Sequence, residues 1–349
     1  MEGNRRRWRV VIVMVAVFVA GCGRSGSGAP SSSATASGTP SPNVYATPPA
    51  RIFAAMAYDV RTHQLVMYGG FTELSQAGGL NDTWAWDGIG WTLVKPHTVP
   101  TIQNPSMAYD VANRELLLVG SEVNGQQRRN SLWGWKDGDL GWVQRAVWMT
   151  PGCGKSCPPS TAMPFAAGAL IYDSPRSRIL MLTGGPAGPG NETWSWDRAK
   201  WSQIPTAHRP TLTSCCVSPD GATGRLLALG YYFDWGGINR LWVFDGTDWT
   251  LTSTPTPAGN VMMINDPSTD RPLLVRSTDI DGNLSLGTWS WSGSAWQRLD
   301  VTLPPPLTDS SLGYDAAHKA VILFGGRDAY GRPVSDTWVW NGRAWNKQP

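Results

Sequence analysis

Charge, histidine and helical periodicity are all scarce in this 349-residue chain. Charged residues make up 16% of it, and the formal net charge of +3 comes partly from arginines at the extreme N-terminus. The rest of the chain is therefore close to neutral, and we expect no nucleic acid or acidic polymer as a partner. No stretch beyond the N-terminal segment shows a helical period, whereas 39 Gly, 27 Pro and 20 Trp indicate tight turns and large flat side chains.

Signatures of catalysis and metal binding are also missing. No GxSxG, HExxH or phosphate-loop motif occurs. The stretch that starts at Asp279 lacks the glycine and the final acidic residue of a calcium-binding loop. We therefore expect no cofactor, no metal and no catalytic residue. The four histidines are expected to divide between two opposite faces of the fold predicted below; they are His63, His97, His208 and His318.

The N-terminus has the pattern of an export signal. A basic start precedes an apolar run over roughly residues 10–20, which has the length of a signal-peptide core and is short for a membrane span. Residues 19–22, Val-Ala-Gly-Cys, resemble the lipobox of bacterial lipoproteins, in which the chain is cut before the cysteine and the thiol carries a diacylglycerol. The resemblance implies lipidation at Cys22 and a place on the outer face of the cell membrane. An ordinary signal peptide and an uncleaved anchor are the alternatives.

Residues 23–50 consist almost entirely of Gly, Ser, Ala, Thr and Pro. Such a stretch cannot bury enough apolar surface to fold. After lipidation it would serve as a flexible tether that holds a domain away from the membrane. We expect the folded domain to begin near Arg51.

The remainder of the chain is a sixfold repeat. Its mark is a pair of tryptophans one residue apart followed by a third, as in TWAWDGIGW at 83–91. The first tryptophans of the six copies lie at 84, 133, 194, 242, 289 and 338, a period of about 48 residues with one insertion. Two segments recur in phase: a short strand that ends in aspartate, as in FAAMAYD at 53–59, and an aliphatic strand, as in QLVMYGG at 64–70.

Each copy therefore predicts four strands, A to D in chain order, with the tryptophan pair on C and the third tryptophan at the start of D. Asp-Gly turns such as Asp87-Gly88 favour a hairpin between C and D. Six four-stranded units predict an all-β, six-bladed β-propeller over 51–349. We expect its ring to close by packing of the first blade on the last, without an exchanged strand. The expected blades are about 51–98, 99–147, 160–206, 211–255, 258–303 and 307–349.

The repeat also resembles kelch repeats, which combine an aliphatic strand, a glycine pair, Asp-Thr-Trp and a later tryptophan. The second, fourth and fifth copies depart from this pattern at the glycines or the aspartate. The resemblance implies a propeller of the kelch or galactose-oxidase-like type. It does not imply the oxidase's copper centre, which needs two histidines and two tyrosines at the axis. The matching residues are Gly69, Gly70, Asp82 and Trp91 in the first copy and Gly325, Gly326, Asp336 and Trp345 in the last.

Most tryptophans occupy repeat positions, and we interpret these as structural. Alternate residues of a strand share a face, so each pair is expected to fill the gap against small strand-A residues of the next blade. Each buried ring removes roughly 150–250 Å² from water. Off-pattern Trp148 and Trp235 are the better candidates for ligand contact, with packing inside a loop as the alternative. The structural set is Trp84, Trp86, Trp91, Trp133, Trp135, Trp142, Trp194, Trp196, Trp201, Trp242, Trp249, Trp289, Trp291, Trp296, Trp338, Trp340 and Trp345.

Alternating strand direction sorts the connections between strands. The A–B and C–D turns are expected on one face, and the B–C loops with the D–A linkers on the other. The second set is long and varied, and variable loops on a rigid scaffold usually carry function. We therefore expect a protein or glycan ligand to bind there. The candidate residues are Arg128, Arg129, Tyr231, Tyr232, Asp234, Trp235, Arg240, Asp279, Arg327, Asp328, Tyr330 and Arg332.

Four cysteines follow the lipobox. In an exported protein they suggest two disulfides. A local bridge between the first two is favoured, while a vicinal pair, a cross-link to the fourth blade and a thiolate metal site are alternatives. They are Cys153, Cys157, Cys215 and Cys216.

The sequence as a whole favours a monomeric, lipid-anchored, extracytoplasmic propeller that binds a protein or a glycan without catalysis. The alternative is a carbohydrate-active enzyme, because some exported bacterial kelch propellers act as sialic-acid mutarotases. Such a site would need an arginine and a carboxylate near the axis on one face. The candidate pairs are Arg240 with Asp234 and Arg327 with Asp328.

Overall fold

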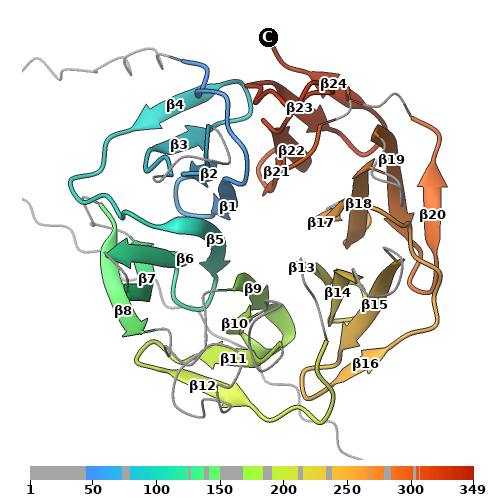
Figure 1. Ribbon diagram of the computed structural model, residues 1–349, viewed down its shortest axis with the longest axis horizontal. Helices are drawn as coiled ribbons and strands as arrows, with labels where there is room; N and C mark the ends of the chain where they lie inside the picture. The colour runs from blue at the N-terminus through green and yellow to red at the C-terminus, as the bar shows by residue number, and fades with distance from the viewer. Residues whose placement is uncertain are drawn as a thin grey trace, which may run out of the picture. The chain divides into compact units, whose positions relative to one another are not determined.

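The protein folds into six four-stranded antiparallel sheets arranged as blades around a central axis (Figure 1). This computed structural model confirms the prediction of an all-β, six-bladed propeller. No helix among the described residues is long and apolar enough to cross a membrane. The structure describes residues 45–72, 79–124, 127–136, 141–149, 168–183, 191–210, 215–232, 238–266, 268–278, 284–301, 304–305 and 307–349.

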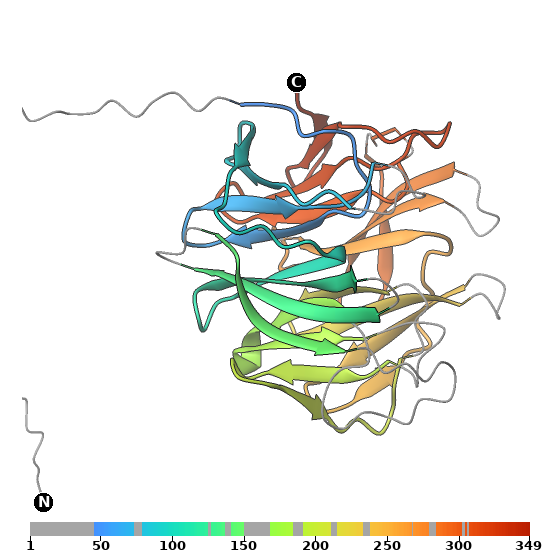
Figure 2. The same ribbon diagram turned by 60° about the vertical axis from the view of Figure 1, so that its left-hand side comes forward.

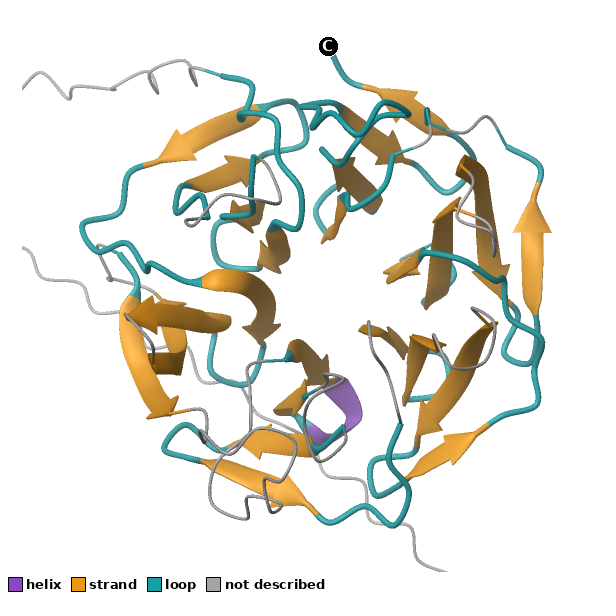
Figure 3. Cartoon of the chain, viewed as in Figure 1, coloured by secondary structure: helices purple, strands orange, loops and turns teal. Residues whose placement is uncertain are grey.

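Each blade is a meander of four consecutive strands, with strand A next to the axis and strand D at the rim (Figures 1 and 3). The A strands are β1 (Ala55–Asp59), β5 (Gln103–Asp110), β9 (Ala169–Asp173), β13 (Cys215–Asp220), β17 (Val261–Asp266) and β21 (Ser311–Asp315). The B strands are β2 (Gln64–Tyr68), β6 (Glu115–Asn124), β10 (Arg178–Leu182), β14 (Arg225–Tyr232), β18 (Arg271–Thr278) and β22 (Ala320–Phe324).

The two outer positions carry the tryptophans of the repeat. The C strands are β3 (Thr83–Trp86), β7 (Gln127–Lys136), β11 (Thr193–Trp196), β15 (Ile238–Phe244), β19 (Leu284–Trp291) and β23 (Thr337–Trp340). The D strands are β4 (Trp91–Val94), β8 (Val143–Met149), β12 (Trp201–Ile204), β16 (Trp249–Leu251), β20 (Trp296–Leu299) and β24 (Trp345–Lys347). In the turned view of Figure 2 the strands of successive blades are seen from the side of the ring.

The aspartate that ends each A strand has a structural role at the A–B turn. Its carboxylate accepts hydrogen bonds from the turn: Oδ1 of Asp315 accepts the backbone N–H groups of Ala317 (3.1 Å) and His318 (3.3 Å). Side-chain acceptors of this kind stabilise turns, which explains why the residue recurs in every copy. All six are buried: Asp59, Asp110, Asp173, Asp220, Asp266 and Asp315.

The hydrophobic core is divided into six clusters, each formed between consecutive blades. Trp84 and Trp86 of blade 1 pack with Ala320, Ile322 and Phe324 of β22 in blade 6. The prediction that the tryptophan pair packs on strand A of the next blade is therefore wrong. The rings face the preceding blade, and they meet mainly its strand B, because that aliphatic strand supplies the largest apolar side chains on the facing surface.

A second contact between blades joins the third tryptophan to the residue that begins strand C of the preceding blade. Where that residue is threonine, its hydroxyl accepts the indole N–H. These pairs are Trp91 with Thr337 (3.0 Å), Trp142 with Thr83 (3.3 Å), Trp249 with Thr193 (2.8 Å) and Trp345 with Thr288 (3.1 Å). Blades 2 and 4 carry leucine there, Leu132 and Leu241. The indole nitrogens of Trp201 and Trp296, which follow them, are buried without a partner among the described residues.

The ring closes between blades 6 and 1 without an exchanged strand, as predicted, because every sheet consists of consecutive strands. Three backbone hydrogen bonds between the segment before β1 and blade 6 strengthen this junction. Gly326 donates to the carbonyl of Arg51 (2.8 Å), Arg51 donates to the carbonyl of Val334 (3.3 Å), and Phe53 donates to the carbonyl of Asp309 (3.0 Å). The segment that leads into blade 1 therefore ties the two ends of the propeller together.

Candidate binding face

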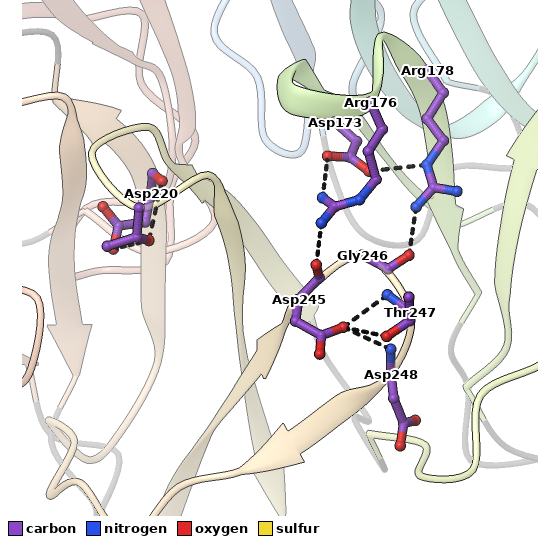
Figure 4. Close-up of polar contacts among 9 residues, drawn as sticks. Asp173, Arg176, Arg178, Asp220, Asp245, Gly246, Thr247 and Asp248 are labelled. Atoms are coloured by element: carbon purple, nitrogen blue, oxygen red, sulfur yellow. Dashed lines mark hydrogen bonds and ion pairs between the residues drawn. The ribbon is translucent and has the colours of Figure 1, made fainter.

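The A–B and C–D turns share one face, as predicted, and many of their polar groups are engaged between blades. In Figure 4, Arg176 and Arg178 of blade 3 both reach the C–D turn of blade 4. Arg178 donates to the carbonyl of Gly246 (2.8 Å), and Arg176 donates to the carbonyl of Asp245. Both guanidinium groups also pair with buried Asp173, at 3.1 and 2.9 Å. Where such contacts form, this face is closed by its own side chains.

The D–A linkers are not confined to the opposite face, contrary to the prediction. His208 lies in the linker after β12, yet its Nδ1 is 2.7 Å from Oδ2 of Asp248 in the C–D turn of blade 4. The D strands lie at the twisted outer edge of each blade, and the described linkers after β4, β12 and β16 each contact the next blade's C–D turn. The predicted separation of the four histidines between two faces is therefore wrong. Among the described residues no group of three or more His, Cys, Asp or Glu side chains could hold a metal ion.

The B–C loop of blade 6 is held in one conformation around Asp328. Its Oδ1 accepts the backbone N–H groups of Tyr330 and Arg332, both at 2.9 Å. Its Oδ2 accepts two hydrogen bonds from the guanidinium of Arg332, at 2.9 and 2.7 Å. The Arg332 guanidinium lies 4.9 Å from the centre of the Tyr330 ring, and Tyr330 is 82% exposed. This ordered loop thus presents an aromatic ring and a cation to solvent.

Arg327 begins the same loop and pairs with a different carboxylate from the one predicted. Its Nε lies 3.2 Å from Oδ2 of Asp309, just before β21, whereas Asp328 pairs with Arg332. Burial raises the pKa of Asp309, and the Arg327 charge offsets only part of that rise. We call Phe53, Asp309, Arg327, Tyr330 and Arg332 the blade-6 cluster. Phe53, which is 43% exposed, is joined to it by the backbone hydrogen bond to Asp309.

Arg51 is a residue whose contacts were not predicted. Its side chain is fully buried and donates to the carbonyl of Gly69 (2.9 Å) and to both carboxylate oxygens of Asp82 (2.7 and 2.8 Å). Asp82 also accepts the indole N–H of Trp84 (2.7 Å). Burial would raise the pKa of Asp82, but its bonds to Arg51 and Trp84 outweigh burial and lower it. The place of Asp82 in the kelch-like Asp-Thr-Trp pattern was the one signal that pointed to this pair.

The candidates of blades 2, 4 and 5 do not join the blade-6 cluster by any contact in the described part of the chain. Arg129 pairs with buried Glu122 across the β6–β7 hairpin at 2.5 Å. Arg240 lies partly buried in β15. Side chains of Arg128, Tyr231 and Tyr232 are not described, although their backbones lie in β7 and β14; Asp234, Trp235 and Asp279 lie outside the described residues, so the predicted Arg240–Asp234 pair is not described either.

Trp148 is structural rather than a ligand contact. It lies in β8, is 3% exposed, and its ring meets that of Trp201 edge-on at 6.1 Å. It departs from the repeat pattern because strand D of blade 2 extends further than the repeat predicts. The repeat tryptophans that we interpreted as structural are all buried or partly buried.

Cys216 in β13 has a free thiol, whose sulfur lies 3.7 Å from the carbonyl of Leu229. Burial raises the pKa of this thiol to about 12. The structure thus shows no disulfide at Cys216. Cys153 and Cys157 lie outside the described residues, and the side chain of Cys215 is not described.

No protein-family model and no curated protein sequence matches the chain. Several solved structures match the chain. The chain is similar to the structure of YjhT, with a TM-score of 0.58 and 12% identity over 87% of this chain and 99% of that one. It is similar to an alpha-L-arabinanase of Penicillium chrysogenum complexed with arabinobiose, with a TM-score of 0.55 and 10% identity over 86% and 95% of the two chains.

A fungal alcohol oxidase of the AA5 family in complex with copper also shares the architecture. Its TM-score is 0.50 and its identity 12%, over 82% of this chain and 62% of that one. Identities this low show a common fold and nothing about chemistry. The chain therefore shares its fold with these structures.

Proposed function

We propose that the protein is a lipid-anchored, extracytoplasmic propeller that binds a glycan at the blade-6 cluster. The observation that carries the proposal is the loop around Asp328, which holds Tyr330 in solvent with Arg332 stacked on it. Exposed aromatic rings with an adjacent arginine are typical of binding hot spots. A loop that is already ordered loses little conformational entropy on binding, so its contacts contribute more to affinity.

A glycan fits this chemistry better than an extended apolar partner. The Tyr330 ring offers an apolar surface for the CH groups of a sugar, while the exposed guanidinium of Arg332 offers a hydrogen-bond donor for its oxygens. A neighbouring fold, the arabinanase, was solved with a bound disaccharide, which supports sugars as ligands of such propellers. Binding of a protein instead of a glycan at this loop would contradict the glycan assignment.

The test is a glycan array followed by calorimetry on the best ligand. Tyr330→Ala should weaken that ligand by about tenfold or more, with the thermal midpoint unchanged because the ring is 82% exposed. Ile89→Ala, which removes a 70% exposed side chain from the C–D turn of blade 1, is the matched control. The proposal fails if no glycan binds, or if Tyr330→Ala binds as tightly as Ile89→Ala does.

The membrane anchor has its own test. Cys22→Ser should remove the acylation site that the lipobox resemblance implies, so the protein should lose incorporation of labelled palmitate and leave the membrane fraction. A variant that still carries label would assign the lipid to another residue or refute lipidation at Cys22.

An enzyme of the sialic-acid mutarotase type is the second candidate. The raised pKa of Asp309 beside Arg327 favours it, because a general acid must hold its proton and an arginine can bind the sugar's carboxylate. Asp309→Asn should then slow anomer exchange of sialic acid, followed by NMR, while binding persists. Exchange at the uncatalysed rate in the wild type would dismiss this candidate.

A further inference from the structure

A hollow of about 330 Å³ opens between blades 2 and 3 on the face of the A–B and C–D turns, away from the B–C loops. Its wall includes Asn113, Glu115, Lys136, Arg145, Trp196 and Arg198. Its volume is at the lower end of the range for small-molecule sites. Nothing in the blade-6 cluster or the export signal uses these residues.

The hollow exists because the repeat is interrupted on both sides of this boundary. At the 3–4 and 6–1 boundaries a side chain of the A–B turn, Arg176 or His318, lies against a glycine of the next C–D turn, Gly246 or Gly88. A Cβ atom at either glycine would collide with that side chain. Those two boundaries are therefore filled.

At the 2–3 boundary the corresponding A–B residue is Asn113. This shorter side chain donates a hydrogen bond to its own Asp110. The C–D turn of blade 3 carries Arg198 where those of blades 1, 4, 5 and 6 have glycine, and its φ of +80° lies in the left-handed region. A residue with a Cβ is strained in this region, so the backbone at this position would favour glycine. The side chain of Arg198 lines the hollow.

The charges around the hollow favour an anion. Glu115 is buried and paired with Arg145 at 2.5 Å. Their ion pair occupies the space above Gly134, where a Cβ would meet both side chains. The described wall carries three positive side chains, Lys136, Arg145 and Arg198, and one negative side chain, Glu115, so its net charge is +2. Arg198 has no ion-pair partner in the described part of the chain.

We propose that this hollow binds a small organic oxyanion of about the size of a monosaccharide. Its carboxylate or phosphate would lie between Arg198 and Lys136, where a guanidinium can donate two parallel hydrogen bonds. Trp196, which is 6% exposed, would contact its apolar side. A sugar acid and a sugar phosphate both combine an oxyanion with an apolar side, so the experiment below compares the two.

The experiment titrates glucuronate, glucose 6-phosphate and neutral glucose into the wild-type protein by calorimetry. At least one anion should bind, glucose should not, and added salt should weaken the anion because the hollow is open to solvent. The stronger of the two anions identifies the source of the oxyanion. Equal binding of glucose, or binding of neither anion, overturns the proposal.

Two variants locate the site. Arg198→Gly should weaken the anion at least tenfold and, at the same time, raise the thermal midpoint, because glycine accepts the left-handed backbone without strain. Arg343→Ala, which removes an exposed arginine from the C–D turn of blade 6, should leave binding unchanged. The assignment is overturned if the Arg198→Gly variant binds the anion as tightly as the wild type does. It is also overturned if Arg343→Ala weakens anion binding as much as Arg198→Gly does. Tyr330→Ala should retain the anion, which separates this site from the proposed glycan site.

Discussion

Replacing Thr337 by valine tests whether the ring is closed by the hydrogen bond from Trp91. Valine has nearly the shape of threonine, so the substitution removes the hydroxyl that accepts the indole N–H at 3.0 Å and little else. Trp91 is 3% exposed and Thr337 is 7% exposed, so water cannot replace the lost acceptor without a rearrangement. The N–H would then resemble those of Trp201 and Trp296, which are buried without a partner in the described structure.

The cost follows from leaving one buried donor unsatisfied, about 1–3 kcal/mol. The added methyl group buries about one more carbon and returns up to roughly 0.8 kcal/mol. We therefore expect a net loss of about 1–2 kcal/mol in the free energy of unfolding. With an unfolding entropy of about 2.1 cal/mol/K per residue, a domain of this size should lose about 2–3 °C in its thermal midpoint.

A double-mutant cycle with Trp91→Phe isolates the bond. Phenylalanine has no N–H, so Thr337→Val should cost nothing further in that background, and the coupling measured by chemical denaturation should equal about the single-mutant cost. The same loss with and without the indole would refute the hydrogen-bond explanation and assign the effect to packing. An unchanged midpoint in the single variant would show that Thr337 contributes nothing to closure.

Three further predictions concern charge, backbone and thiol. The pKa of Asp82 is lowered in the folded state, so its pair with Arg51 stabilises the protein at pH values above 3.8, the usual pKa of the group. That stability is lost as the pH falls through the lowered pKa. Asp82→Asn should lower the free energy of unfolding by about 3 kcal/mol at neutral pH and reduce its dependence on pH in the acid range. Gly246→Ala should lower the thermal midpoint by an amount equivalent to about 1–3 kcal/mol, because φ is +103° and the new methyl group would strike Arg176. With its pKa raised to about 12, Cys216 should resist iodoacetamide at pH 8 until the protein unfolds, as mass spectrometry would show.

The strands and their order follow from the sequence because the repeat shows the same pattern six times. Strand alternation places Trp84 and Trp86 on one face of a sheet, but both faces of a blade are covered, so periodicity alone cannot say which neighbour they meet. The sequence does not predict which charged residues form ion pairs either. Arg51 and Asp82 are 31 positions apart in the sequence. Arg327 pairs with Asp309 and not with its chain neighbour Asp328, because the B–C loop turns Asp328 toward Arg332.

Positions that are alike in every blade cannot distinguish one ligand-binding place on the ring from five others, so a specific site must lie where the copies differ. Not every difference qualifies. Leu132 and Leu241 replace the threonine acceptor, but they leave only a buried indole N–H unpaired and present no group to solvent. Arg198 and the Tyr330 loop differ in another way: each places a polar or aromatic side chain at an open surface, and Arg198 does so at a cost in backbone strain. The two proposed sites rest on departures of this second kind, and because they lie on opposite faces, we propose a separate ligand for each.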